Sequence, residues 1–479
     1  MSNLPVIQNI NLTGDQSRIL AKIYEDVNST CSNILNSNDI YSRIVSLTGS
    51  AGTGKTFLTV QIIKKLCESN ISCSVTAPTH KAASVIGEAI YNNGIKISAK
   101  TIHSFLGIKP FIDYATGIES FTVDKRAKKI AVDVLIVDES SMINDDLFEL
   151  IIEALESNLV RYVIFVGDPN QLLPVSGSSQ TIFKLKNQYK LTEIVRQAKG
   201  SYIINLADKI KNMIENENYI SMDEFFKKNV INEIEYFHSE QDFVNDFYSK
   251  TNWFDTDKIL ATHKNKDVTA FNTQIRNQYW IQKGTLKPEF LRQGDTLRFL
   301  DAYTVNDVTI YHNGQEILLD YAVKKYHEKL EIYYWECKSV NVTEQQIFRV
   351  VDPISEKTFN DKLHILSNMA KKTPFPERNK MWKIYYDVRN MFANVQYIYS
   401  STIHKLQGST YETCYVNVYD LITNNFMSLD EKYRLLYVAI TRASKDIKIF
   451  MPGIKKDDSI NTHKMLNSID DELDNIFNK

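Results

Sequence analysis

Residues 49–56 have the residue types and the spacing of a phosphate-binding loop. They read Gly-Ser-Ala-Gly-Thr-Gly-Lys-Thr, the full G-x-x-x-x-G-K-S/T pattern, between an apolar β-branched run and a segment with helical spacing. At such a turn, backbone N–H groups and a helix N-terminus face an anion. Lys55 would reach the β- and γ-phosphates, and the Thr56 hydroxyl would ligate Mg²⁺. The pattern predicts a nucleoside triphosphate site at Gly49, Ser50, Ala51, Gly52, Thr53, Gly54, Lys55 and Thr56.

Two carboxylates follow a later apolar run, Val134-Leu-Ile-Val-Asp138-Glu139. A buried parallel strand delivers acids to its carboxyl end in this way. Asp138 would hold Mg²⁺, and Glu139 would act as general base toward the attacking water. Surface strand ends often carry such pairs. Together with the loop about eighty residues upstream, however, the pair predicts hydrolysis of the nucleotide.

A third apolar run, residues 162–166, ends in Gly167-Asp-Pro-Asn-Gln171. Glycine and proline there are ordinary turn residues. Gln171 carries an amide that both donates and accepts, so at the edge of the same sheet it could sense the γ-phosphate or its water.

The elements that must position these residues alternate between strand and helix. Candidate strands cover residues 44–47, 72–76, 132–137 and 162–166, with a helix at 57–69. This alternation of strands and helices predicts an α/β fold with a mostly parallel sheet. Residues 107–129 interrupt it as a small insertion. A second alternating region begins near Lys258 and is expected to resume at 393–400 and 413–418, after about a hundred residues rich in Tyr, Trp and Val.

Length and composition limit the class of protein. A chain of 479 residues with 43% hydrophobic and 24% charged residues predicts two to four soluble domains. The five cysteines form no C-x-x-C pair, which favours a reducing compartment without structural zinc. We find no signal peptide and no membrane-spanning run, so we expect a cytoplasmic protein without a membrane partner. A net charge of −2 argues against indiscriminate binding to polyanions but allows a local basic channel.

These motifs resemble motifs I, II and III of the superfamily 1 helicases, and the remaining motifs of that family occur in order. Residues 12–16 resemble the Q motif, whose Gln16 would read adenine. Motifs Ia, Ib, IV, V and VI resemble residues 76–83, 101–104, 191–197, 401–408 and 436–443. The compact size and the His-Lys-x-Gln-Gly form of motif V resemble the 1B branch. The matches span residues 12–443, nearly the whole chain.

The resemblance implies ATP- and Mg²⁺-dependent movement 5′→3′ along single-stranded DNA, with separation of duplex DNA. It also implies two RecA-like lobes, each with an insertion. We expect lobe 1 at residues 1–103 and 131–195, a pin insertion at 104–130, lobe 2 at 196–296 and 395–455, an SH3-like β-rich insertion with a hook at 297–394, and a tail at 456–479. Within motif context, Gln407 and Gly408 would join the ATP site. Arg196 and Arg442 would neutralise charge on the γ-phosphate as arginine fingers.

Short hydroxyl and imidazole donors follow several strand ends and suit phosphate oxygens, which carry no sequence information. The expected DNA-binding residues are Pro78, Thr79, His80, Thr101, His103, Thr402 and His404. A lone threonine in this position is also a common helix N-cap. The strand-separating pin is expected at Phe121, with Phe111 and Tyr114 as alternatives, unless all three simply pack the insertion. The basic residues 125–129 would touch the duplex or form a solvated face.

The second insertion contains an Asn313-Gly314 pair, a strong hairpin signal. Its Trp335 and the run 382–386 would form the core of barrel and hook, and part of it would contact the pin.

Two other functions remain open at this point. A translocase that displaces proteins without unwinding is favoured if Phe121 is buried. A nucleotide-switch module would not need Glu139, Gln171 and both arginines. Backbone contacts alone do not distinguish DNA from RNA. The expected partners are single-stranded DNA and junctions of single and double strands, with a single-strand-binding protein or replisome component. We expect a monomer, in the host cytoplasm if the source is viral.

Overall fold

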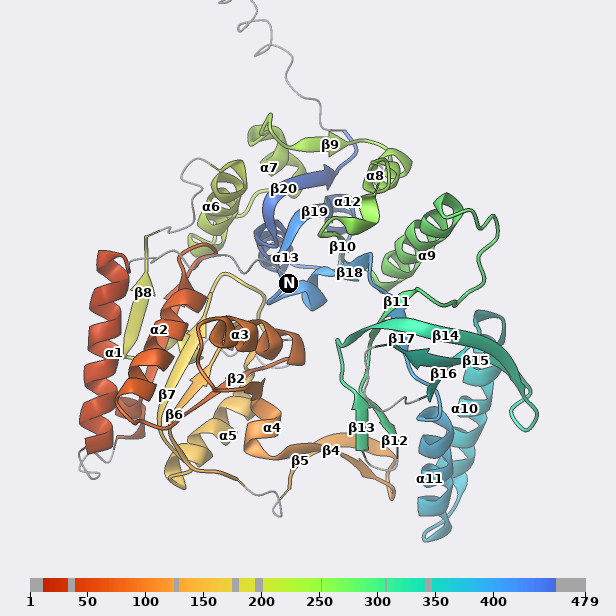
Figure 1. Ribbon diagram of the computed structural model, residues 1–479, viewed down its shortest axis with the longest axis horizontal. Coiled ribbons are helices and arrows are strands. Elements are labelled where there is room, and N and C mark those ends of the chain that lie inside the picture. The colour runs from red at the N-terminus through yellow and green to blue at the C-terminus, as the bar shows by residue number, and fades with distance from the viewer. Residues whose placement is uncertain are drawn as a thin grey trace, which may run out of the picture.

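Two parallel sheets flanked by helices form the body of the molecule, and two smaller units project from them (Figure 1). The structure is a computed structural model that describes residues 12–32, 39–124, 129–174, 181–193, 201–250, 252–305, 308–340 and 347–453. In this part of the chain, no helix is long and apolar enough to cross a membrane.

The sheet of lobe 1 has six parallel strands in the order β3-β2-β6-β7-β1-β8. Its strands are β1 (Ile44–Gly49), β2 (Cys73–Ala77), β3 (Ala99–Thr101), β6 (Val132–Val137), β7 (Val160–Gly167) and β8 (Gln188–Leu191). Its helices are α1 (Gly14–Ser32), α2 (Lys55–Glu68), α3 (His80–Asn92), α4 (Ile102–Leu106) and α5 (Asp145–Glu156). The four predicted strands and the predicted helix are confirmed as β1, β2, β6, β7 and α2.

Alternation along the central strands explains this layering. Val134 and Ile136 of β6 pack in the core beneath α1, α2 and α3. Leu135 and Val137 point to the opposite face and pack against α4 and α5. A strand buried on both faces must be apolar throughout, which is why these runs lack the polar alternation of a half-exposed strand. The carboxyl ends of all six strands share one edge of the sheet.

Lobe 2 repeats this architecture with five parallel strands in the order β18-β10-β19-β20-β9. Its strands are β9 (Glu235–Phe237), β10 (Lys258–Thr262), β18 (Ser400–Thr402), β19 (Tyr411–Asn417) and β20 (Ala443–Phe450). Its helices are α6 (Tyr202–Glu215), α7 (Met222–Lys228), α8 (Glu240–Phe247), α9 (Asn265–Gln282), the 3₁₀ helix η6 (Ile403–Leu406), α12 (Val418–Ile422) and α13 (Leu429–Thr441). Helices α6, α7 and α13 share one core with the sheet, and α8 and α9 pack on its other face.

The insertion in lobe 1 is a hairpin of β4 (Ile108–Asp113) and β5 (Ile118–Val123). The insertion in lobe 2 carries an antiparallel sheet ordered β16-β15-β14-β11-β17, a small ribbon β12-β13, and two helices. Its elements are β11 (Thr296–Phe299), β12 (Tyr303–Val305), β13 (Val308–Tyr311), β14 (Glu316–His327), β15 (Ile332–Ser339), β16 (Ile347–Val351), α10 (Glu356–Lys372), α11 (Glu377–Arg389) and β17 (Val395–Tyr397). In Figure 1 the hairpin reaches from lobe 1 toward this second insertion.

Two sequence expectations were wrong in detail, and a third was less specific than the structure. Most of residues 393–400 do not resume the parallel sheet of lobe 2, because β17 pairs antiparallel with β11. The segment reaches that sheet only at its end, where β18 begins and pairs with β10. Residues 382–386, expected in the core of barrel and hook, lie on α11, where Trp382 and Tyr386 are buried in a small core with Ala370. Asn313 and Gly314 do form a turn, with Gly314 at φ 80°, but the strands on either side pair with other strands and not with each other. For β17 the pairing partner, β11, is distant in sequence.

Candidate nucleotide site and nucleic-acid interface

The loop between β1 and α2 depends on glycine for its shape. Gly52 has φ 83° and Gly54 has φ 80°, in the left-handed region that glycine tolerates. A side chain at Gly49 would place its Cβ 2.5 Å from Oγ1 of Thr53. The loop therefore stays compact at the carboxyl end of β1 and leads directly into the N-terminus of α2, as the sequence predicted.

Polar contacts hold the loop from within and from α1. Nζ of Lys55 donates to the carbonyl oxygens of Gly49 (2.6 Å) and Ser50 (3.0 Å). The Thr53 hydroxyl donates to Ser50 O at 2.8 Å, and Nε2 of the buried Gln16 donates to Thr53 O at 3.3 Å. The ammonium group thus lies over the loop where phosphates would sit, and Gln16 contacts the loop directly.

The carboxylates of Asp138 and Glu139 lie where β6 ends. Burial, followed by the neighbouring Glu139, raises the pKa of Asp138 to about 7, although Lys55 acts in the opposite direction. Glu139 has a left-handed φ of 50°, which is unusual for a residue with a side chain. Excess negative charge at this position fits a divalent cation. Asp138 and the exposed Thr56 would hold Mg²⁺, which neutralises phosphate charge when bound.

Gln171 is buried in the segment that follows β7, the neighbour of β1 in the sheet. Its side-chain Oε1 is buried and lacks a hydrogen-bond partner among the described residues. An unpaired buried carbonyl oxygen is costly, so this atom fits a water or ligand that the protein itself does not supply. The position suits the sensing role predicted for Gln171.

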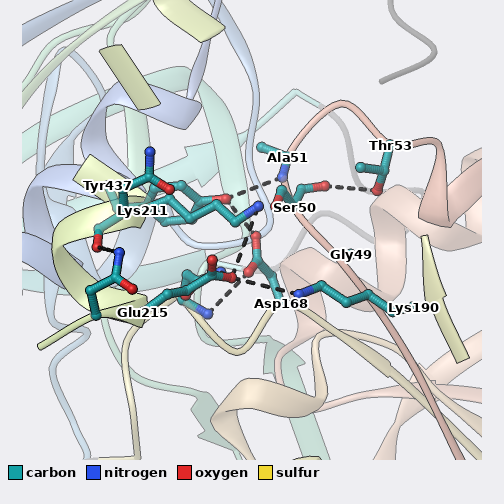
Figure 2. A network of polar contacts seen from close by, with 12 residues as sticks. Gly49, Ser50, Ala51, Thr53, Asp168, Lys190, Lys211, Glu215 and Tyr437 are labelled. Atoms are coloured by element: carbon teal, nitrogen blue, oxygen red, sulfur yellow. Dashed lines mark hydrogen bonds and ion pairs between the residues drawn. The ribbon is translucent and has the colours of Figure 1, made fainter. Parts of the chain in front are cut away.

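Two side chains of α13 reach from lobe 2 to the nucleotide loop and the segment after β7. The Tyr437 hydroxyl accepts from the Ala51 N–H at 3.2 Å and donates to Oδ2 of Asp168 at 2.7 Å (Figure 2). Nη1 of Arg434 donates to the carbonyl oxygens of Pro169 (2.7 Å) and Gln171 (3.1 Å). The nucleotide site is therefore bordered by both lobes.

A second bridge between the lobes lies beside this one. Glu215 at the end of α6 lies 3.8 Å from Nζ of Lys190 on β8 and 3.9 Å from Nζ of Lys211 (Figure 2). Nδ2 of Asn170 donates to the same carboxylate at 3.4 Å. The Lys211 pair lies within α6, so only Lys190 and Asn170 link Glu215 to lobe 1. Because Lys190 is exposed, its ion pair contributes little to stability.

The structure describes one of the two arginines predicted as arginine fingers. Arg442 is buried, and its guanidinium donates to Val438 O (3.1 Å), Ser409 O (2.9 Å) and Thr441 Oγ1 (3.1 Å), all within lobe 2. Arg196 lies outside the described residues.

Motif V comes close to lobe 1. Gly408 has φ 74°, and a Cβ there would lie 3.3 Å from Cβ of Ala82 and 3.8 Å from Oε1 of Glu139. Nε2 of its neighbour Gln407 is buried without a hydrogen-bond partner in the described structure. Lobe 2 therefore approaches both the general-base candidate and the start of α3.

The DNA candidates of lobe 1 lie at the carboxyl ends of β2 and β3. The hydroxyl of Thr79, which follows Pro78, accepts from Ala82 N at 3.2 Å, and that of Thr101 accepts from Ser104 N at 3.2 Å. Both threonines thus serve as helix N-caps, the alternative that the sequence had left open. A hydroxyl that accepts retains its own proton, so a capping role does not exclude donation to a phosphate.

Two histidine rings at the carboxyl edge of this sheet pack against rings of the two insertions. The ring of His80 stacks on that of His312 in the second insertion, with centroids 4.2 Å apart. The ring of His103 lies 5.5 Å from that of Phe121 on the hairpin.

The candidates of lobe 2 form a separate group. Thr402 ends β18 and is buried, and His404 follows in η6. The ring of His404 lies 5.8 Å from that of His263, at the end of β10. Burial, and then His263, lower the pKa of His404. The predicted residues therefore divide into one group on each lobe.

Phe121 is paired with Pro110 across the hairpin, and 70% of its surface is exposed. Tyr114 packs against Tyr386 of α11, with ring centroids 6.2 Å apart.

The hairpin tip is held by the second insertion. The Tyr386 hydroxyl donates to Gly117 O at 2.9 Å, and Arg389 pairs with Glu119 at 2.8 Å. The expected contact between the second insertion and the pin is thus present. Residues 125–128 of the predicted basic cluster lie outside the described residues.

Comparisons with known proteins agree with this geometry. Residues 33–177 match the family model described as an AAA domain, and residues 397–447 match the UvrD-like helicase C-terminal domain. The chain is 26% identical to an uncharacterized protein of Acanthamoeba polyphaga mimivirus, over 84% of this chain and 94% of that protein. It is 25% identical to the ATP-dependent DNA helicase dda of Enterobacteria phage T4, over 84% of this chain and 93% of that protein.

These matches make the chain similar to the superfamily 1B helicases. Its relatives include the helicase Dda and RecD subunits of the RecBCD enzyme, and its two parallel sheets are RecA-like lobes. A solved structure of Pif1 helicases at forked double-stranded DNA superposes with a TM-score of 0.49 and 18% identity, over 96% of this chain and 98% of that chain.

Four residues at these sites were not predicted from the sequence: Arg434, Tyr437, His263 and His312. Arg434 and Tyr437 are three residues apart on α13 and share one face, and Tyr437 lies inside motif VI. The spacing of Arg434 and Tyr437 is visible in the sequence, but their hydrogen-bond partners in lobe 1 are not. His263 directly follows an apolar strand, as His80 nearly does, and this is a usable signal. His312 lies in a loop and has no local signal.

Proposed function

We propose that this chain is an ATP-dependent DNA helicase that moves 5′→3′ on single-stranded DNA and separates duplex DNA ahead of it. The observation that supports this most is that the nucleotide loop is bordered by both lobes. Tyr437 contacts Ala51, and Gly408 lies beside Ala82 and Glu139. The DNA candidates lie on the same two lobes. A change at the nucleotide would therefore alter the distance between the two groups of DNA contacts.

The residues around the loop divide the chemistry among them. Lys55 leaves its two carbonyl partners to contact the phosphates, and Asp138 with Thr56 holds Mg²⁺. Glu139 accepts a proton from the attacking water, while Gln171 orients that water through its unpaired Oε1. Arg442 exchanges a partner in lobe 2 for the γ-phosphate when the lobes close.

Movement then follows from closing and reopening of the lobes. Thr79, His80, Thr101 and His103 hold the strand on lobe 1, and Thr402 and His404 hold it on lobe 2. Contacts to the backbone alone allow movement past any base. The 5′→3′ direction rests on the resemblance to the 1B branch.

Strand separation is assigned to the hairpin. Phe121 is exposed and not buried, so the condition that favoured a translocase without unwinding is absent. The tip of the hairpin is held by Tyr386 and Arg389 of α11, which gives the pin a rigid support against the duplex. The partners proposed for this activity are single-stranded DNA, forked junctions and a single-strand-binding protein, with the chain acting as a monomer.

Strand displacement on forked DNA with either a 5′ or a 3′ single-stranded tail tests this proposal. We expect ATP-dependent unwinding of the 5′-tailed fork alone, lost in Lys55→Ala and retained in Lys64→Ala, an exposed lysine on the same helix. Unwinding of the 3′-tailed fork alone would overturn the direction. DNA-stimulated hydrolysis without unwinding of either fork would replace the helicase with a translocase.

A further inference from the structure

A cavity lies where lobe 2 passes into the second insertion, between the end of α9 and the start of β11. Its volume is about 580 Å³, and it is lined by Trp280, Thr285, Lys287, Glu289, Arg292 and Gln293. The indole belongs to the last turn of α9, and the other five residues belong to the loop that follows. Lobe 2 reaches the nucleotide site through α6 and α13, which pack on the opposite face of its sheet. A ligand of this cavity would therefore not compete with the nucleotide.

The walls of the cavity are held by a buried carboxylate and a glycine. Asp295 accepts from Nε1 of Trp280 (2.7 Å), from the main-chain N–H of Arg292 (2.9 Å) and from the buried guanidinium of Arg276 (2.9 and 2.7 Å). Gly294 has φ 89°, and a Cβ there would lie 3.2 Å from the indole ring. The guanidinium of Arg292 lies 4.0 Å from the centre of the same ring. The shape of the cavity is therefore set before a ligand binds.

The loop that forms most of the cavity carries an excess of positive charge at its surface. Lys283, Lys287 and Arg292 stand against one exposed carboxylate, that of Glu289. Lys283 lies over the ring of Phe254 at 4.3 Å, and Arg292 donates to the Thr285 hydroxyl at 2.8 Å. In the described part of the chain, none of these three cations forms an ion pair. The loop is therefore free to pair with carboxylates from elsewhere.

Apolar surface accompanies these cations. Leu286 lies between two lining residues, and 90% of its surface is exposed. The indole of Trp280 is only half-buried at the floor of the same loop. Cations beside exposed apolar side chains fit a segment in which carboxylates alternate with apolar residues, because each kind of side chain then finds a partner.

A segment with this chemistry follows the last described strand of the chain. Residues 469–477 read Ile-Asp-Asp-Glu-Leu-Asp-Asn-Ile-Phe, with four carboxylates, four apolar side chains and no cation. They lie beyond Gly453, the last described residue. The chain thus supplies its own candidate for the cavity.

The distance from the end of β20 allows this segment to reach the cavity. Phe450, the last residue of β20, shares one core with Ile275 of α9. Trp280 lies five residues further along that helix, about 8 Å along its axis. Residues 454–468 would span up to about 50 Å when extended. The connection is therefore long enough with chain to spare.

We propose that residues 469–477 bind this cavity as an intramolecular ligand, with their carboxylates against the three cations and their apolar side chains against Trp280 and Leu286. This inference goes beyond the proposed function and does not depend on it. A tethered segment has an effective concentration of about 1 mM, so an affinity of about 100 μM keeps the cavity mostly occupied. An acidic and apolar peptide of a partner protein would bind there only by displacing the tail. Because β11 begins directly after the loop, a bound tail would also limit movement of the second insertion against lobe 2.

Carbodiimide cross-linking of the full chain, read by peptide mass spectrometry, tests whether the tail lies at the cavity. The reagent joins a carboxylate to a lysine Nζ with loss of water where the two are in contact. We expect links from residues 470–474 to Lys283 or Lys287, and their loss at about 1 M salt, where charges are screened within about 3 Å. In a mixture of isotopically labelled and unlabelled chains, each link should join residues of one chain.

Fluorescence anisotropy with a labelled peptide of residues 466–479 measures the competition by the tail. Its binding to the wild type is compared with binding to a full chain that carries Asp470→Asn, Asp471→Asn, Glu472→Gln and Asp474→Asn. We expect the neutralised chain to bind the peptide about tenfold more tightly, because its own tail no longer competes. Adding Lys287→Glu should abolish this binding. The matched control is Lys329→Glu, at an exposed lysine between β14 and β15, which should leave it unchanged.

Each contrary result overturns a definite part of the inference. Equal peptide affinity of the wild type and the neutralised chain overturns the intramolecular ligand. Equal binding of a scrambled peptide of the same composition would mean attraction of charge alone and overturns the placement of the apolar side chains. Links between labelled and unlabelled chains would place the tail in a second copy. None of these experiments uses ATP or DNA, so their failure leaves the proposed function to its own test.

Discussion

The hydroxyl of Tyr437 donates a hydrogen bond of 2.7 Å to Oδ2 of Asp168, across the boundary between the two lobes. The same hydroxyl accepts from the Ala51 N–H of the nucleotide loop. Burial, followed by the charge of Asp168, raises the pKa of Tyr437 well above that of a free tyrosine, so the hydroxyl is protonated and can donate at neutral pH. One side chain of lobe 2 thus joins two segments of the nucleotide site in lobe 1.

Tyr437→Phe removes this connection while keeping the ring. The carboxylate of Asp168 then loses a buried donor, at a cost of about 1–3 kcal/mol in the free energy of unfolding. Because the loop and motif III would no longer be tied to α13, we expect DNA-stimulated ATP hydrolysis to fall by about tenfold and basal hydrolysis by less. Steady-state rates with and without single-stranded DNA, together with a thermal melt, measure both effects.

Tyr433→Phe is the matched control for that variant. Tyr433 is a buried tyrosine on the same helix, and its hydroxyl donates to Ile220 O at 3.2 Å within lobe 2. It should lower stability without separating basal from stimulated hydrolysis. Equal effects of the two substitutions on the stimulated rate would contradict a specific role for Tyr437.

The first sheet and the nucleotide loop could be predicted because their signals are local. Strands buried on both faces are continuous apolar runs, as residues 134–137 and 162–166 show, and the loop at residues 49–56 is one unbroken pattern. The carboxyl edge of a parallel sheet then brings Asp138 and Gln171 near the loop without further information.

The parts of the fold and of the site that the sequence did not predict depend on contacts between residues far apart in the chain. β17 pairs with β11, nearly a hundred residues earlier, so its sheet could not be assigned from its own composition. Tyr437 reaches Ala51 across 386 positions. The partners of Trp382 and Tyr386 lie on the hairpin of the other lobe. Local patterns carry no information about such pairs.

The affinity for single-stranded DNA should rise as the pH falls. In the free protein the pKa of His404 lies below 6.5, so its contribution to folding stability is complete above that pH and is lost as the pH falls. A phosphate contact favours the imidazolium and raises the pKa in the complex, so protons are taken up on binding. Dissociation constants measured from about pH 8 to about pH 6 should show this slope. His404→Gln should flatten it, and an unchanged slope in that variant would exclude His404 as its source.

Arg442 should be needed for turnover as well as for packing. Arg442→Lys keeps the charge but cannot make the three hydrogen bonds to Val438, Ser409 and Thr441. If the guanidinium moves to the γ-phosphate when the lobes close, kcat should fall by about a hundredfold or more with little change in the KM for ATP. A normal kcat with a lower melting temperature would limit Arg442 to its structural role.

The contact between the hairpin tip and α11 should be required for unwinding but not for ATP hydrolysis. Gly117 has φ 73° at the tip, and a methyl group there would overlap the indole ring of Trp382. Gly117→Ala should therefore push the tip away from α11 and break the bond from Tyr386 to Gly117 O. We expect unwinding of forked DNA to fall several-fold more than DNA-stimulated hydrolysis, because the pin loses its support while the lobes are untouched.

Gly94→Ala is the control that separates the loss of docking of the hairpin tip from backbone strain at the substituted glycine. Gly94 has nearly the same φ, 74°, but nothing lies within 4 Å of a Cβ at that position. The two substitutions therefore carry similar conformational costs, and they differ in the clash with Trp382 alone. The ratio of base pairs unwound to ATP hydrolysed should fall in Gly117→Ala and stay at the wild-type value in Gly94→Ala. If Trp382→Ala is then added to Gly117→Ala, the ring that clashes is gone, and part of the unwinding should return. A ratio that falls equally in both glycine variants would mean that the docking of the tip on α11 does not support strand separation.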